Sequence, residues 1–429
     1  MRSISLAYML FGLLLWGCGE AGEEAPDDSA ATPEIPQYSA EAFFETTSYS
    51  LASGDGYAFS ADDTRLLVTS DETGIFNAYA LDPASGERTR LTNSESDAVF
   101  ALSWFPADDR ILFTRDSGGN ERNHVFVRER DTSPDNVYVA GLPDGEARKL
   151  TEALNPAIAE EHLVAGEVVR FASYDGLDIP GILYKPHQAG VENPVPAMVW
   201  VHGGPGGQSR KGYRATIQHL VNHGYAVFAI NNRGSSGYGK TFFHRDDKRH
   251  GEADLGDVVA SRDFLASQDW IDGETVGIIG GSYGGYMVAA ALAFEPEAFD
   301  VGIDIFGVTN WVRTLKQIPD WWAAQREALY DELGDPVEEE ERLRRISPLF
   351  HAENITKPLL VVQGANDPRV HQVESDELVA EVRSSGVPVE YIVFDDEGHG
   401  FRNRSNRIEA STAYIAFLDR YLKGDGADG

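Results

Sequence analysis

The chain has 429 residues, of which 42% are hydrophobic and 24% are charged, a balance typical of globular proteins. At roughly 150 residues per domain, this length predicts two or three domains and excludes a single small binding module. The 36 Lys and Arg against 69 Asp and Glu give a net charge of -33, which argues against nucleic acid as a partner. The single cysteine excludes an intrachain disulfide framework and a Cys-rich zinc site.

The first 17 residues resemble a bacterial lipoprotein signal peptide. Met1-Arg2 is a short positive start, and Leu6 to Trp16 is an apolar stretch too short to span a bilayer. Cys18 follows in a context similar to a lipobox, and the alternative is an ordinary secretory signal with an incidental cysteine. We expect lipidation of Cys18 as the only membrane attachment. Gly19 after it implies the outer membrane of the bacterial cell envelope, facing the periplasm.

Residues 18–40 are rich in Asp, Glu, Ala, Pro and Ser, which predicts a flexible acidic tether. Residues 41–154 then alternate short apolar and polar segments with turn residues, which predicts an all-β domain. The run Ala61 to Thr69 recurs as Ala107 to Thr114, and the Asn77 to Thr92 region has counterparts from Asn136 to Thr151. Two copies of a four-stranded unit favour a partial β-propeller of two blades, with a generic antiparallel sandwich as the alternative.

Residues 155–429 have the pattern of an α/β domain. Helix-like stretches, such as Glu252 to Ser267, Tyr283 to Phe294 and Val373 to Ser385, alternate with apolar runs of strand length. The expected strands are Ala197–Val201, Tyr225–Ile230, Val276–Ile279, Val301–Ile305, Leu359–Val362 and Tyr391–Phe394. This alternation predicts a doubly wound, mostly parallel sheet.

Three candidate catalytic residues each follow a predicted strand. Ser282 lies in Gly280-Gly281-Ser282-Tyr283-Gly284, between a strand and a helix, which is the context of a nucleophile elbow. Asp367 and His399 follow the next-to-last and last predicted strands. The order Ser, Asp, His is that of the α/β hydrolases, and these residue types together perform nucleophilic acyl transfer.

Acyl transfer also needs donors for a tetrahedral oxyanion. We expect one from the backbone N–H of Tyr283, directly after the candidate nucleophile. The other is expected from Gly204 in the glycine-rich loop 202–207, where the backbone can approach a substrate closely. The loop matches neither nucleotide-binding glycine pattern.

These motifs together resemble the prolyl oligopeptidase family of serine peptidases, especially its acylaminoacyl peptidase-like branch. The likeness extends over residues 155–423 and rests on five stretches: 202–205, 231–239, 280–287, 364–370 and 398–401. The resemblance implies a catalytic triad of Ser282, Asp367 and His399, with Tyr283 and Gly204 as oxyanion donors. It also implies that Arg369 contacts a substrate carbonyl. Val370 and the aromatic residues near Trp321 and Trp322 would line the pocket for the residue before the scissile bond.

Members of this family pair such a hydrolase domain with a propeller of some seven blades, so the resemblance implies a shortened propeller here. Two blades leave a sheet edge and apolar faces that the hydrolase domain or a second copy of the chain must cover. We therefore expect self-association. Nothing in the blades resembles the paired glutamates with which dipeptidyl peptidases hold an amino terminus.

The sequence thus predicts a serine peptidase acting on short peptides, with a serine esterase or a non-catalytic binding protein as alternatives. No metal or cofactor is expected. The remaining histidines, including His219, His223, His244 and His250, lack metal-ligand spacing and are expected on the surface.

Overall fold

The computed structural model describes residues 35–52, 56–105, 109–115, 124–128, 154–318 and 322–424. The expected signal peptide, Cys18 and most of the expected tether lie outside the described residues. In the described ranges, no helix is both long enough and apolar enough to cross a membrane.

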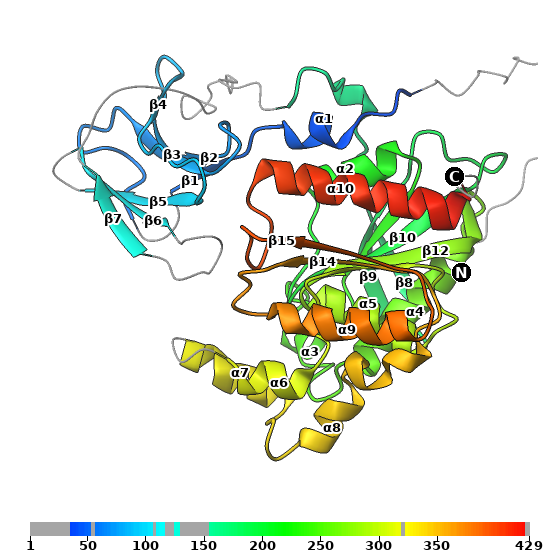
Figure 1. Cartoon of the computed structure of the whole chain (residues 1–429). Helices are drawn as coiled ribbons and strands as arrows, with labels where there is room; N and C mark the ends of the chain where they lie inside the picture. The colour runs from blue at the N-terminus through cyan, green and yellow to red at the C-terminus, as the bar shows by residue number, and fades with distance from the viewer. Residues whose placement is uncertain are drawn as a thin grey trace, which may run out of the picture. The chain divides into compact units, whose positions relative to one another are not determined.

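A sheet of eight strands forms the centre of the larger part of the chain (Figure 1). Its strand order is β15-β14-β13-β12-β10-β11-β9-β8. The six strands from β10 to β15 pair in parallel, and β9 and β8 add an antiparallel edge. The strands are β8 (Glu167–Ala172), β9 (Asp178–Tyr184), β10 (Val195–Val201), β11 (Ala226–Ile230), β12 (Ile271–Gly281), β13 (Gly302–Ile305), β14 (Leu359–Gly364) and β15 (Val389–Phe394).

The six parallel strands confirm the six predicted from apolar runs. Strands of this kind are apolar throughout because helices cover both of their faces. The antiparallel strands β8 and β9 were not predicted: β9 contains Pro180 and Gly181, and β8 is exposed at four of its six positions. Pro180 directly precedes the residues of β9 that pair with β11, the first of which is Gly181 opposite Ile230, and a missing backbone N–H is tolerated near the start of a paired segment.

Helices cover both faces of the large sheet (Figure 1). On one face, α4 (Ala253–Ala266), α5 (Tyr283–Phe294) and α9 (Gln372–Ser384) pack into one hydrophobic cluster with the strands. On the other face, α2 (Ala215–Asn222) and α10 (Arg404–Leu418) form a second cluster. This confirms the predicted doubly wound architecture and the three predicted helices. The remaining described α-helices are α1 (Ala40–Phe44), α3 (Lys240–Phe243), α6 (Trp311–Lys316), α7 (Ala323–Leu333) and α8 (Glu340–Arg345).

Two small antiparallel sheets precede the large sheet in the chain. The first has the order β1-β2-β3-β4 and the second the order β5-β6-β7. Their strands are β1 (Tyr49–Leu51), β2 (Leu66–Ser70), β3 (Asn77–Asp82), β4 (Glu87–Arg90), β5 (Val99–Trp104), β6 (Ile111–Arg115) and β7 (His124–Arg128).

The first sheet has the four strands expected of one blade. The residues expected to form the later part of the second unit, from Asn136 to Thr151, lie outside the described ranges. Between β1 and β2, residues 57–59 form isolated bridges, of Phe59 with Leu66 and of Tyr57 with Trp104. Through these two bridges, the segment links β2 of the first sheet to β5 of the second.

The first small sheet contacts helix α10 through a buried carboxylate. Asp71, directly after β2, is fully buried, and its Oδ2 lies 2.8 Å from Nη2 of Arg407. Its backbone oxygen accepts a hydrogen bond from Arg404 at 2.6 Å. The end of β2 is therefore tied to helix α10 of the larger part of the chain.

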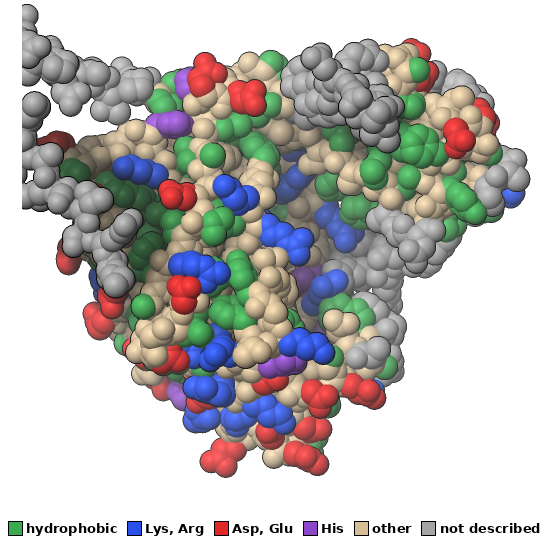
Figure 2. All heavy atoms as spheres, turned by 180° about the vertical axis from the view of Figure 1, so that it is seen from behind, with side chains coloured by type: hydrophobic (Ala, Val, Ile, Leu, Met, Phe, Trp, Pro, Cys, Tyr) green, Lys and Arg blue, Asp and Glu red, His purple; other side chains and the backbone are tan. Residues whose placement is uncertain are grey.

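Charge is distributed unevenly over the surface. Figure 2 shows Lys and Arg side chains gathered in the middle of one face, whereas Asp and Glu are prominent along its lower border. Although the net charge is -33, parts of the surface are therefore rich in positive side chains.

Candidate active site

Ser282 stands at a sharp corner between β12 and α5. Its backbone has φ 59° and ψ -118°, a conformation that is strained for a residue with a side chain. Two glycines make the corner sterically feasible. A Cβ at Gly280 would lie 2.5 Å from backbone atoms of Gly284, and one at Gly284 would lie 2.2 Å from the carbonyl oxygen of Val201. This is the geometry of a nucleophile elbow.

The structure brings Ser282, His399 and Asp367 into one hydrogen-bonded chain. His399 Nε2 lies 2.9 Å from Ser282 Oγ, and His399 Nδ1 lies 2.7 Å from Asp367 Oδ2. The Asp367 side chain is fully buried, whereas that of His399 is 10% exposed. The three residues come from the carboxyl ends of β12, β14 and β15, the edge at which parallel sheets hold their sites.

Asp367 is held by the backbone that follows it. Its Oδ1 accepts hydrogen bonds from the N–H groups of Arg369 and Val370, both at 2.9 Å. The other carboxylate oxygen therefore remains directed at His399.

The loop that carries His399 is organised by Glu397, a residue to which the sequence analysis gave no role. This carboxylate is buried and accepts hydrogen bonds from the N–H groups of Arg402 and Asn403 at 2.9 and 2.8 Å. Burial raises the pKa of Glu397, and these donors counteract the effect. Phe306 also supports the loop, because its ring centre lies 4.8 Å from that of His399.

The glycine-rich loop after β10 lies against the same corner. A Cβ at Gly203 would lie 3.5 Å from Cβ of Ser282, and Gly204 lines a pocket together with Ser282 and His399. His202 fixes the loop through hydrogen bonds of its ring to Gly203 O at 2.9 Å and Ser235 Oγ at 2.8 Å. Burial lowers the pKa of His202, which favours the neutral ring.

Tyr283, the second expected donor, is the first residue of α5. The backbone N–H groups in the first turn of a helix have no intrahelical acceptor. The N–H of Tyr283 is therefore available to a ligand bound at Ser282.

The pocket beside Ser282 has a volume of about 770 Å³, within the range of small-molecule and peptide sites. Arg369 and Trp322 line it, and the guanidinium of Arg369 lies 4.6 Å from the centre of the Trp322 ring. Asp247, Asp331 and Glu332 give the pocket an acidic wall that was not predicted.

Two of the expected pocket residues are not placed in its lining. Val370 is buried in the core behind the pocket, where its backbone holds Asp367. Trp321 lies outside the described residues.

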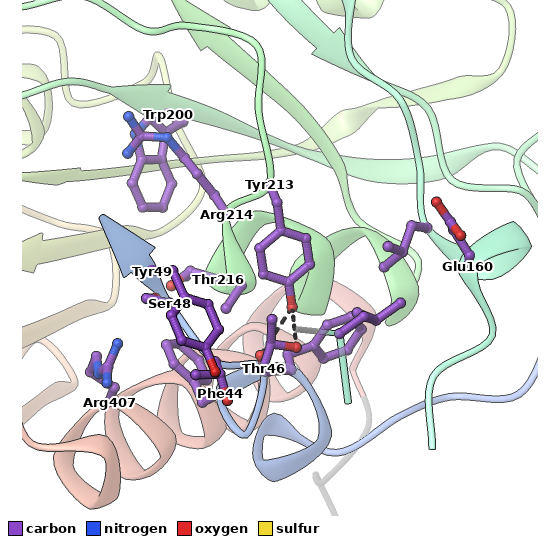
Figure 3. A pocket seen from close by; sticks show the side chains of 15 residues that line it. Phe44, Thr46, Ser48, Tyr49, Glu160, Trp200, Tyr213, Arg214, Thr216 and Arg407 are labelled. Carbon is purple, nitrogen blue, oxygen red and sulfur yellow. Dashed lines mark hydrogen bonds between the residues drawn. The ribbon is translucent and has the colours of Figure 1, made fainter. Parts of the chain in front are cut away.

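A second cavity, of about 680 Å³, lies between residues 43–49, the segment before α2 and helix α10. Figure 3 shows Phe44, Trp200, Tyr213 and Arg407 on its walls. Tyr213 closes one side by donating a hydrogen bond to the carbonyl oxygen of Phe43 at 3.0 Å. Its lining contains none of Ser282, Asp367 and His399, so this cavity is separate from the candidate active site.

The expectation of surface histidines was wrong for two of the four residues. His219 is buried in α2 and its Nδ1 lies 2.8 Å from Ser411 Oγ. His250 is fully buried between carboxylates. A single histidine carries no pattern of its own that indicates burial, so neither position could be recognised as buried from the sequence.

The fold and this arrangement define an α/β hydrolase with a Ser-His-Asp constellation. The model of the prolyl oligopeptidase family matches residues 211–425, half of the chain, and the chain belongs to this family.

Relatives and solved structures agree with this assignment. The chain is 37% identical over 291 residues to dipeptidyl aminopeptidase BIII of Pseudoxanthomonas mexicana, covering 66% of this chain and 42% of that protein. It is also 37% identical over 235 residues to dipeptidyl peptidase family member 6 of Caenorhabditis elegans, covering 54% and 32%. The solved acylaminoacyl peptidase of Pyrococcus horikoshii superposes with a TM-score of 0.60 at 26% identity, covering 85% of this chain and 56% of that one. The matched region spans less than half the length of the Pseudoxanthomonas mexicana and Caenorhabditis elegans proteins.

Proposed function

We propose that this chain is a serine peptidase that hydrolyses short peptides through an acyl-enzyme on Ser282. The observation that carries the proposal is the position of His399, which is hydrogen-bonded to both Ser282 and Asp367 beside a pocket. Membership of the prolyl oligopeptidase family supports a peptide substrate.

In the proposed reaction, Ser282 Oγ attacks the carbonyl carbon of the scissile bond while its proton passes to His399 Nε2. Asp367 keeps the ring in the orientation that accepts this proton and stabilises the imidazolium that forms. His399 then protonates the leaving amine. A water molecule, deprotonated by the same ring, attacks the acyl carbon. The bond from that carbon to Ser282 Oγ then breaks as His399 returns the proton to Oγ, which releases the carboxylic acid product.

The negative charge that develops on the carbonyl oxygen is stabilised by two backbone N–H groups, those of Tyr283 and Gly204. Such donors act mainly in the transition state, because the oxygen moves toward them as it becomes tetrahedral. The closeness of this loop to Ser282 supports the assignment, since a Cβ added at Gly203 would lie 3.5 Å from Cβ of Ser282.

Arg369 and Trp322 line the pocket beside Ser282, and we assign to Arg369 a contact with a substrate carbonyl. The cation–π stacking of its guanidinium on Trp322 restricts the orientation of its donors. Val370 supports the site indirectly by holding Asp367.

Turnover of three matched substrates tests this function against its alternatives. These are an N-acetylated peptide p-nitroanilide, the same peptide with a free amino terminus, and the corresponding p-nitrophenyl ester. We expect hydrolysis of at least one of the two peptides. Turnover of the ester alone would indicate an esterase, and turnover of none would indicate a non-catalytic binding protein.

We also propose that Cys18 carries a lipid that anchors the protein in the bacterial envelope, on the sequence of residues 1–19. Cys18→Ser should move the protein from the membrane fraction to the soluble periplasmic fraction. Retention of the Cys18→Ser protein in the membrane fraction would contradict this anchor.

A further inference from the structure

A cluster of ionisable side chains is buried directly behind the nucleophile elbow. It consists of Asp246, His250, Asp254, Tyr283 and Glu332. The side chains of His250 and Asp254 are fully buried, those of Asp246 and Tyr283 are 2% and 3% exposed, and that of Glu332 is 16% exposed. The cluster joins three parts of the fold: the turn leading into α4, the first residue of α5, and the last turn of α7.

The contacts within the cluster form a continuous chain. The hydroxyl of Tyr283 donates a short hydrogen bond to Asp254 Oδ2. The ring of His250 stands edge-on to that of Tyr283, with centres 5.7 Å apart. On its other side, His250 Nε2 lies 3.4 Å from Asp246 Oδ2 and 3.7 Å from Glu332 Oε1.

Two members of the cluster, Tyr283 and Glu332, border the candidate active site. Tyr283 directly follows Ser282 and supplies a proposed oxyanion donor from its backbone. Glu332 lines the pocket that also contains Ser282 and His399. His250 therefore lies between the corner that holds the nucleophile and the opposite wall of the pocket.

Backbone packing fixes the cluster closely. A Cβ at Gly234 would lie 1.8 Å from Asp246 Oδ2, and one at Gly251 would lie 1.9 Å from the hydroxyl oxygen of Tyr286. Asp254 Oδ1 accepts hydrogen bonds from the N–H groups of Gly251 and Leu255, both at 2.8 Å. The side chains of the cluster therefore have little room to rearrange when the charge of His250 changes.

Electrostatics favours a positive charge on His250. Burial lowers its pKa, but Glu332, Asp254 and Asp246 outweigh that effect, so its pKa is raised. Burial in turn raises the pKa of Asp254, and raises that of Asp246 to about 8. The titratable groups that face His250 are Asp246 on its own turn, Asp254 on α4, Tyr283 on α5 and Glu332 on α7.

We propose that His250 is a positioning residue for acyl transfer, which holds the Tyr283 corner and the α7 wall of the pocket in register with Ser282. The inference rests on the proposed function. As a cation between carboxylates, His250 attracts Asp254, which is bonded to Tyr283, and Glu332, which lines the pocket. Without that charge, Glu332 and Asp254 lose the attraction toward His250, and both the oxyanion donor and the wall move.

Steady-state kinetics of His250→Gln test this role. We expect kcat to fall by about 10- to 100-fold, with a smaller rise in KM, because a misplaced oxyanion donor weakens the transition state most. Tyr283→Phe removes only the hydroxyl that reaches Asp254, and it should lower kcat by about 3- to 10-fold. This second variant keeps the test decisive if His250→Gln does not fold.

The pH profile separates positioning from a loss of stability. In the wild type, deprotonation of the cluster at alkaline pH should lower kcat, with an apparent pKa that belongs to the cluster as a whole. His250→Gln should lack this alkaline decline. His219→Gln is the matched control, since His219 is also a buried histidine but packs on the other face of the sheet, and it should keep the wild-type kcat and profile.

Labelling of Ser282 with a fluorophosphonate distinguishes a failure of the proposed function from a failure of the proposed role of His250. If the wild type is not labelled, the proposed function fails. If the wild type is labelled but folded His250→Gln and Tyr283→Phe proteins keep its kcat and pH profile, only the role of His250 is overturned. An equal loss of kcat in His219→Gln would overturn it as well.

Discussion

Gly284 packs so closely against β10 that a Cβ added to it would lie 2.2 Å from the carbonyl oxygen of Val201. This contact sets how near α5 approaches the sheet, and with it the position of Ser282 at the start of that helix. The glycine is therefore required by the approach of two backbones.

Gly284→Ala should displace the elbow and lower kcat/KM by at least about 100-fold, because a shift of about 1 Å at a catalytic group has that scale of effect. Gly190→Ala is the control, since a Cβ at Gly190 meets nothing within 4 Å. Kinetics of both variants, with thermal unfolding as a check on the fold, would measure the difference. Equal kcat/KM values would show that the contact is not needed.

Asp367→Asn should keep the fold and lower kcat by roughly 10³- to 10⁴-fold, because an amide no longer selects the imidazole tautomer that accepts a proton from Ser282. Asp395→Asn, at an exposed position nearby, should leave kcat unchanged. If Asp367→Asn retained more than about a tenth of the wild-type kcat, Asp367 would not have the proposed role.

Asp304 predicts a pH dependence of stability. Burial raises its pKa to about 8 from an ordinary value of 3.8, so between these values the folded protein holds a proton that the unfolded chain has released. The contribution of Asp304 to the free energy of unfolding should therefore decrease as pH rises through this window, by up to about 1.4 kcal/mol per pH unit. Above pH 8 its contribution should be constant.

Asp304→Asn mimics the protonated side chain and keeps the oxygen that accepts the N–H of Gly307. Its stability relative to the wild type should increase from pH 5 to pH 8, as measured by urea unfolding at several pH values. A difference that stays constant over this range would mean that Asp304 does not carry the proton.

The parts of the fold with a regular hydrophobic pattern could be predicted from the sequence. The six parallel strands are continuous apolar runs, and the order of Ser282, Asp367 and His399 along the chain follows from their places after β12, β14 and β15. In contrast, β8 and β9 lack this signal, since β9 contains Pro180 and one face of β8 is exposed.

Contacts between residues far apart in the sequence could not be predicted. Glu397 was visible only as a neighbour of His399, although its carboxylate binds two N–H groups of the loop. His250 and Glu332 are 82 positions apart in the numbering and meet only because α7 folds back onto the turn before α4. No sequence periodicity predicts this contact, because it depends on tertiary packing alone.

The role of Ser282 as nucleophile is tested most directly by mass spectrometry of the adduct formed with a fluorophosphonate, combined with turnover of a peptide p-nitroanilide. We expect one adduct on Ser282 and loss of both labelling and turnover in Ser282→Ala, while Ser405→Ala, at an exposed position on α10, behaves like the wild type. A Ser282→Ala protein that still hydrolyses the peptide at the wild-type rate, or an adduct on another residue, would contradict it.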